Sequence, residues 1–157
     1  MSLRQLELAF EEAARELAFQ GALDDDGCAT IRSSVPGMPA IHMAYEDAGD
    51  ELVLLAEIGN VPDDDPSLYR EFLEDAYLGV DTRCASYAVN PANGKLVLQS
   101  FVPVERLDGQ RLVKMLGDFA ETSFRACRRL VRRLEAEEPS PEVPGLPDDG
   151  VEGAMRV

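Results

Sequence analysis

Few residues of this chain have the type and spacing that catalysis requires. His42 is the only histidine among the 157 residues, and no Asp, Ser or Cys lies at a motif spacing from it. A histidine in that setting is more often a surface residue of a strand than a general base. The chain also lacks a Gly-x-x-x-x-Gly-Lys-Ser/Thr sequence, whose main-chain amides would bind phosphates. We therefore expect neither enzymatic activity, with no catalytic residues, nor a cofactor.

The thiol and acidic side chains do not match a known metal site. The three cysteines share no ligand spacing and are expected to be buried and reduced: Cys28, Cys84 and Cys127. The sequence LDDDG at 23–27 resembles part of a calcium loop. The complete loop would require an acid at Ala22 and a Glu at Ser33, and neither is present. We expect no metal.

A second acidic run, at 63–65, directly precedes Pro66. Carboxylates before a helix interact favourably with the positive end of its dipole, and proline suits the first helical position. The run therefore predicts that Asp65 caps a helix over 67–78 rather than binding a metal.

The charge distribution disfavours polyanionic partners, because the formal net charge is −15. Residues 111–136, in contrast, hold 7 basic and 3 acidic side chains. An arginine cluster on a helix can indicate nucleic-acid binding. The overall charge and the absence of interleaved aromatic residues favour pairing with the chain's own acidic loops instead. We expect no nucleic acid as a partner.

Hydropathy predicts no membrane-spanning segment, because no stretch approaches about 18 consecutive apolar residues. The N-terminus also lacks the basic region and apolar run of a signal peptide. We expect a cytoplasmic protein that does not insert into membranes.

The chain begins with a predicted amphipathic helix. Ser2 and Gln5 have the spacing of a capping box, and Gly21 suits the C-terminal cap. Its apolar stripe is Leu6, Phe10, Ala13 and Leu17. Two interpretations remain open. Either the whole stripe is core, or its N-terminal end with Leu3, Leu6 and Phe10 is partly exposed as a docking groove.

Five short apolar runs bounded by Gly, Pro, Asn or Asp predict strands. They are 28–34, 40–46, 51–58, 84–89 and 95–102. Both faces of the third run are apolar, which predicts a central strand covered on both sides. Asn93 and Gly94 predict a hairpin between the last two strands.

A long helix of about 27 residues is predicted after Asp108, from apolar residues at spacings of three and four. From residue 137 onward, four prolines and six acidic residues predict a disordered tail. The fold class is therefore α+β, in the order helix, three strands, helix, two strands, long helix. We expect one domain over 1–136, with an antiparallel sheet packed against helices, and a tail over 137–157.

In this order of elements the chain resembles the class I type III secretion chaperones, the Tir-chaperone family. The resemblance covers about Leu6 to Arg133. It is carried by LDDDGCATIR, ELVLLAEIGNVPDDDPSLYREFLEDAYL, NPANGKLVLQSFVP and RLDGQRLVKMLGDFAETSFRACRRL.

The resemblance implies a non-enzymatic homodimer that binds the extended N-terminal region of a secreted effector and keeps it export-competent. The dimer interface that it implies uses Leu68, Phe72, Tyr77, Tyr87 and Val89. The effector-binding pockets that it implies use Leu6, Phe10, Ile31 and Met43. Main-chain pairing would supply affinity in such binding, and side-chain pockets would supply specificity.

Two other functions remain as hypotheses. The first is an adaptor or regulatory protein-binding domain of the same fold that has no secreted client. The second is a small-molecule enzyme, which the lack of convergent titratable groups disfavours.

Overall fold

The structure is a computed structural model that describes residues 2–105 and 107–137. Within these residues the elements are α1 (Leu3–Leu17), β1 (Cys28–Ile31), β2 (Ile41–Glu46), β3 (Glu51–Gly59), α2 (Pro66–Asp75), the 3-10 turn η1 (Tyr77–Gly79), β4 (Ser86–Val89), β5 (Leu96–Pro103) and α3 (Gly109–Glu137). The predicted α+β order of elements is confirmed. The predicted tail lies outside the described residues, except for Glu137 at the end of α3.

The five strands form one antiparallel sheet in the order β1-β2-β3-β5-β4. The central position predicted for the third strand is therefore confirmed, and β1 and β4 are the two edges. A bulge between Glu57 and Gly59 interrupts the pairing of β3 with β5. Gly59 has φ +145, and a Cβ there would lie 2.7 Å from a methyl group of Leu130, so the bulge brings α3 close to the sheet.

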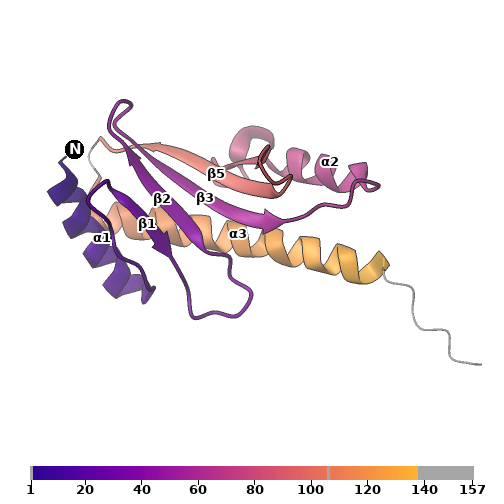
Figure 1. The fold of residues 1–157 in the computed structure, drawn as a ribbon, viewed down its shortest axis with the longest axis horizontal. Coiled ribbons are helices and arrows are strands. Elements are labelled where there is room, and N and C mark those ends of the chain that lie inside the picture. Colours follow the sequence, from indigo (N-terminus) through magenta and orange to yellow (C-terminus); the bar gives the residue numbers. More distant parts are fainter. Residues whose placement is uncertain (1, 106, 138–157) are drawn as a thin grey trace, which may run out of the picture.

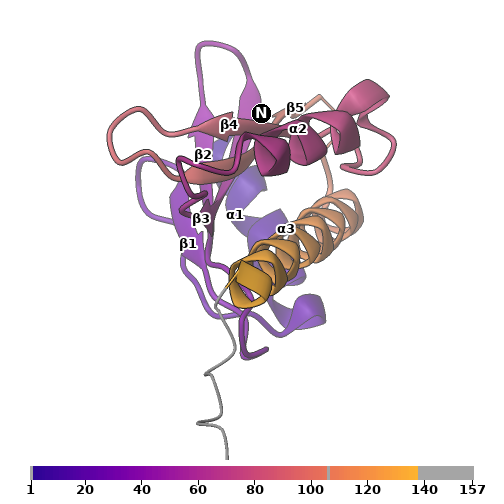
Figure 2. The ribbon, with the colours of Figure 1, turned by 90° about the vertical axis from the view of Figure 1, so that its right-hand side faces the viewer.

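Helices α1 and α3 lie on the same face of the sheet (Figures 1 and 2), and α3 packs along the central strand β3, with Leu130 beside Gly59 at the end of that strand. Helix α1 packs against the first half of α3, where Gln110 donates from Nε2 to Glu12 and Glu16, each at 3.0 Å. Alternate residues of β3 face these helices and are buried: Leu52, Leu54, Ala56 and Ile58. Leu112, Leu116, Phe119 and Leu130 of α3 join them in the core.

The start of α1 was predicted correctly, but its end was not. Ser2 and Gln5 form the expected capping box, with Gln5 N donating to the Ser2 hydroxyl at 3.3 Å. The helix ends at Leu17, and Ala18, not Gly21, takes the left-handed cap conformation. Gly21 is needed for another reason: a Cβ there would lie 2.8 Å from the Thr30 carbonyl oxygen.

Asp65 caps α2, as predicted, and it also joins α2 to α3. Its carboxylate accepts from Leu68 N at 3.2 Å and from Arg133 Nε at 3.1 Å. The hydrogen bond from the Ser67 hydroxyl, followed by the contacts with Arg133 and Leu68 N, holds the pKa of Asp65 below its ordinary range. Because Asp65 is nearly buried, its ionised form contributes to the stability of the fold.

This arrangement predicts a pH-dependent effect of Asp65→Asn. Asparagine keeps the cap but loses the charge. The ionised carboxylate stabilises the fold at pH values above its ordinary pKa, and this contribution is lost as pH falls through the lowered folded-state pKa. We expect the variant to have a Tm about 2–4 °C below the wild type near neutral pH, with a difference that shrinks in acid. Thermal denaturation followed by circular dichroism measures it.

The control is Asp64→Asn, because Asp64 is exposed. A Tm difference for Asp65→Asn that stays constant into acid, or an equal effect of Asp64→Asn, would contradict the assigned role of the carboxylate.

Candidate protein-binding surfaces

A group of large apolar side chains lies exposed at the end of α2, on the loop that follows it, and on edge strand β4. We call it the α2–β4 patch, defined as Leu73, Tyr77, Leu78, Val80 and Val89. Between 47% and 78% of each side chain is exposed. Exposed apolar groups of this kind mark protein interaction sites more often than isolated apolar residues do. The structure thus supplies a candidate surface for a protein partner.

The patch exists because α2 uses its other face to pack on the protein itself. Phe72 is buried, with its ring centroid 4.9 Å from that of Tyr87 on β4 and 5.6 Å from the guanidinium of Arg129 on α3. Burial raises the pKa of Tyr87 to about 12. Leu73 follows Phe72 by one residue and so points to a different side of the helix.

The side chains that the resemblance assigns to the dimer interface differ in exposure. Leu68 and Phe72 are buried inside their own chain, so a second copy cannot reach them in this conformation. Tyr87 is half-buried, while Tyr77 and Val89 are exposed. Leu73, Leu78 and Val80 are exposed and were not among the predicted interface residues. For Leu73 the reason is that helical periodicity does not show which face of α2 meets the protein.

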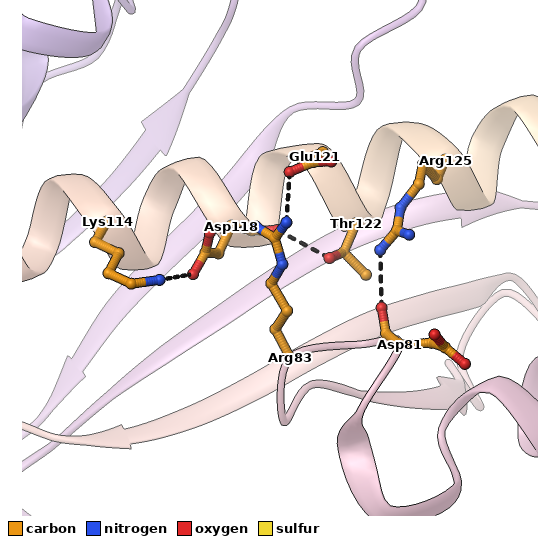
Figure 3. A network of polar contacts seen from close by, with 7 residues as sticks. All are labelled: Asp81, Arg83, Lys114, Asp118, Glu121, Thr122 and Arg125. Atoms are coloured by element: carbon orange, nitrogen blue, oxygen red, sulfur yellow. Dashed lines mark hydrogen bonds and ion pairs between the residues drawn. The ribbon is translucent and has the colours of Figure 1, made fainter.

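The loop between η1 and β4 is fastened to α3 in an unusual backbone conformation. Leu78, Arg83 and Cys84 have positive φ values of 58°, 52° and 70°, which cost energy in residues other than glycine. Arg83 forms ion pairs with Asp118 and with Glu121, the latter at 2.8 Å, and Arg125 Nη2 donates to the Asp81 carbonyl at 2.8 Å (Figure 3).

These contacts hold η1 and the following loop next to α3, and so fix the position of the patch residues that they carry. The ion pairs lie partly in solvent, so the loop's position depends on several contacts together rather than on one strong pair.

The two edges of the sheet differ in what covers them. Beyond β1, the chain's own residues pair with the strand: Gln20 and Arg32 exchange main-chain hydrogen bonds at 2.9 and 2.8 Å, and Asp24 N donates to the Cys28 carbonyl at 2.9 Å. Thr30 lies between these contacts. No described strand or paired segment covers β4. Edge β4 is thus the one at which another strand can be added without displacing part of this chain.

An open pocket of about 460 Å³ lies on the face of the sheet opposite α1 and α3. Its apolar residues include Ala44, Val53 and Leu55, and Thr30 and His42 form a polar pair within it, with Thr30 Oγ1 at 3.2 Å from His42 Nδ1. We call this the outer-face pocket. None of the described helices packs on this face, so the expectation that both faces of the third strand are covered is wrong.

The residues assigned to the effector pockets lie in the core instead. Leu6, Phe10, Ile31 and Met43 are all buried, and each is at most 5% exposed. Leu6, Phe10 and Ile31 do not line the outer-face pocket, whereas Met43 is among its lining residues although its side chain is buried. Of the two interpretations of the α1 stripe, core is the correct one for Leu6 and Phe10. Leu3, at the end of the stripe, is 43% exposed.

The shifted thiol and phenol pKa values among the described residues are all raised. Burial raises the pKa of Cys127 to about 11, and the pKa of Cys28 is also raised. Cys28 and Cys84 are exposed, so the expectation of three buried thiols is wrong for these two. The hydrogen bond from the Tyr45 hydroxyl to Asp50, 2.8 Å long, raises the pKa of Tyr45 to about 12.

Two searches limited to residues 2–105 and 107–137 gave negative results. No cluster of three or more His, Cys, Asp or Glu side chains there is placed to hold a metal ion. No helix in the same part of the chain has the length and apolarity to cross a membrane.

The fold is an α+β domain that exposes apolar side chains at the end of α2 and on β4, and an open pocket on the outer face of the sheet. The model of the Tir chaperone protein (CesT) family matches residues 10–123. The chain therefore belongs to the Tir chaperone protein (CesT) family. None of the curated protein sequences matches it.

Solved structures share the fold at low sequence identity. A chain of the HopA1–SchA chaperone–effector complex aligns with a TM-score of 0.59 and 16% identity, covering 80% of this chain and 94% of that one. A chain of the ExoU–SpcU heterodimer, from the type III secretion system of Pseudomonas aeruginosa, aligns with a TM-score of 0.57 and 20% identity, covering 76% and 95%. YbjN of E. coli, described as a putative transcription regulator, gives 0.56 and 9%, covering 80% and 90%.

The core position of Leu6 leads to a prediction. Leu6→Ala removes a fully buried side chain and leaves a cavity, so we expect the free energy of unfolding to fall by about 2–5 kcal/mol. Leu3→Ala, on the same helix but partly exposed, is the matched control and should cost much less. Denaturant titration measures both. Equal effects of the two substitutions would show that α1 does not pack as described.

Proposed function

We propose that this protein is a non-enzymatic secretion chaperone that acts as a homodimer in the cytoplasm. It binds the extended N-terminal region of an effector protein and keeps it competent for export. Membership of the Tir chaperone protein (CesT) family carries the proposal. The apolar surfaces on the described residues support it, because each suits a protein partner.

We propose that the α2–β4 patch forms the homodimer interface. A two-fold axis beside β4 would bring the same patch of both copies together, so that Leu73 and Tyr77 of each bury apolar surface against the other. Edge β4 supports this arrangement, since it is not covered within the described residues. Alternation in the antiparallel ladder points the main-chain groups of Tyr87 and Val89 away from β5, toward a partner.

We propose that the effector segment lies across the outer-face pocket. Val53 and Leu55 alternate along β3 with buried residues, so their side chains stand on the open face. An extended peptide presents side chains with the same period of two, which suits such a surface. Leu6, Phe10 and Ile31 would support this face from the core rather than contact the effector, whereas Met43 also lines the pocket.

The charge of the protein restricts the effector segments that fit. Asp24 lines the pocket and the net charge of the chain is −15, so a segment with apolar residues and flanking Lys or Arg would be favoured.

The dimer proposal predicts the effect of Leu73→Asp combined with Tyr77→Asp. Both side chains are exposed, so the monomer should fold normally, while two charges at the centre of an apolar contact should raise the dimer dissociation constant at least about 100-fold. Sedimentation equilibrium measures the constant, and circular dichroism checks the fold.

The matched control for the dimer test is Leu8→Asp with Val35→Asp, two exposed apolar residues outside the patch. A variant at Leu73 and Tyr77 that dimerises as tightly as the control would rule out this interface.

The effector proposal predicts the effect of Val53→Asp with Leu55→Asp. Neither side chain is fully buried, and both carry the apolar surface of the outer-face pocket. We expect the variant to remain dimeric but to lose at least about 90% of the co-purified effector, because two charges in an apolar contact cost several kcal/mol. Quantitative mass spectrometry of proteins recovered from the native host measures this loss.

The same experiment separates the chaperone from an adaptor. The effector must be secreted, and its secretion must fall when the chaperone gene is deleted. A stable partner that is never secreted would overturn the export role and favour the adaptor hypothesis. An undiminished yield with the pocket variant would place effector binding elsewhere.

A further inference from the structure

The five arginines near the C-terminal end of α3 fall into two sets. Arg125, Arg129 and Arg133, spaced by four residues, face α2 and its following loop. They contact the Asp81 carbonyl, the Asp75 carboxylate, and the carboxylates of Asp65 and Glu71. Arg128 and Arg132 lie on another side of the helix, are exposed, and have no carboxylate partner among the described residues.

Arg128 and Arg132 border a groove of about 460 Å³ between α3 and the loop that joins β1 to β2. Phe124 and Val131 supply apolar surface, and Val131 is half exposed. The guanidinium of Arg128 lies 5.7 Å from the centre of the Phe124 ring. Glu135 is the one carboxylate among the residues that line the groove. The groove therefore offers an apolar floor with two cations at its rim, in a protein whose net charge is strongly negative.

The α3 residues that line the groove follow, in sequence, the part of the chain that the family model matches. The matched residues are 10–123, whereas Phe124, Arg128, Val131 and Arg132 all follow them. The dimer and effector surfaces proposed above do not use these residues.

The sequence that follows α3 has the chemistry to fill this groove. Helix α3 ends at Glu137, and the next residues are EPSPEVPGLPDD, from 138 to 149. Prolines at 141, 144 and 147 have the three-residue spacing that places side chains on one side of a polyproline II helix. Val143 and Leu146 are apolar, and Glu142, Asp148 and Asp149 are acidic. Proline-rich segments of this kind bind grooves that contain aromatic residues.

The segment is also attached close enough to the groove to reach both arginines. From Glu137 back to Arg132 or Arg128 is about 8–14 Å along the helix, at 1.5 Å per residue. Five extended residues span up to about 17 Å, so the chain around Glu142 and Val143 can reach both arginines. A short tether gives an effective concentration in roughly the millimolar range. A second copy or an external acidic peptide must instead approach a negatively charged protein from solution.

We propose that residues 139–149 of this chain bind in the groove as an intramolecular ligand. Glu142 pairs with Arg128 and Arg132, and Val143 and Leu146 lie on Phe124 and Val131. The proposal stands independently of the chaperone function.

The full-length chain allows a direct test, because it contains no tryptophan. Leu146→Trp therefore introduces a single fluorophore into the proposed ligand while keeping an apolar side chain there. We expect blue-shifted emission, and acrylamide quenching about threefold weaker than in the same protein with Arg128→Glu and Arg132→Glu added. High salt should weaken the difference, because it shortens the Debye length from about 10 Å at 0.1 M to about 3 Å at 1 M.

The matched control adds Arg4→Glu and Arg15→Glu, which change the net charge equally on exposed residues of α1. This control should keep the blue shift. If the Arg128/Arg132 variant does not fold, reversing the charge at residue 142 in the Leu146→Trp chain tests the same pairs without changing α3.

Three results would overturn the proposal. The first is emission typical of water-exposed tryptophan in the Leu146→Trp chain. The second is equal quenching with and without the charge reversal. The third is a blue shift that disappears on dilution, which would assign the groove to a segment of a second copy.

Discussion

The packing of α3 along one face of the sheet is the contact on which the rest of this structure depends. Leu112, Leu116, Phe119 and Leu130 of α3 are buried beside the alternate residues of β3. Because α3 has 29 residues, α1 and α2 both pack against it, α1 near its start and α2 near its end (Figures 1 and 2). All described helices therefore share one face, and the opposite face stays open.

The positive charge of α3 is explained largely by this packing. Acidic residues of α2 and of its neighbouring loops face Arg129 and Arg133. In the opposite sense, Arg83 of the loop before β4 forms an ion pair with Asp118 of α3. The prediction that arginines of the long helix pair with the chain's own acidic segments is thus confirmed for this set. Such partly exposed pairs are individually weak. They position α2 and the η1 loop more than they stabilise the fold, and Arg128 and Arg132 have no such carboxylate partner among the described residues.

The order of helices and strands could be predicted from the sequence, because hydrophobic periodicity and helix capping depend on residues that are close together in the chain. Ser2 and Asp65 cap the helices they were predicted to cap, and the five strands lie where short apolar runs indicated. The end of α1 could not be predicted, because Gly21 serves a close approach to Thr30 rather than a helix cap. That approach depends on a contact between segments that are not adjacent in sequence.

The candidate binding residues were harder to predict for the same reason. An apolar stripe shows that something covers a helix, but not whether the cover is the same chain or a partner. Leu6 and Phe10 proved to be covered by the chain itself, and so did Leu68 and Phe72. Leu73 and Leu55, each next to a buried residue, are the ones left for partners. Their position also separates the two proposed interfaces: the α2–β4 patch lies at the β4 edge, whereas the outer-face pocket lies over β1, β2 and β3 on the opposite face. A second copy at β4 would leave the pocket open, so dimerisation and effector binding can occur together on one chain.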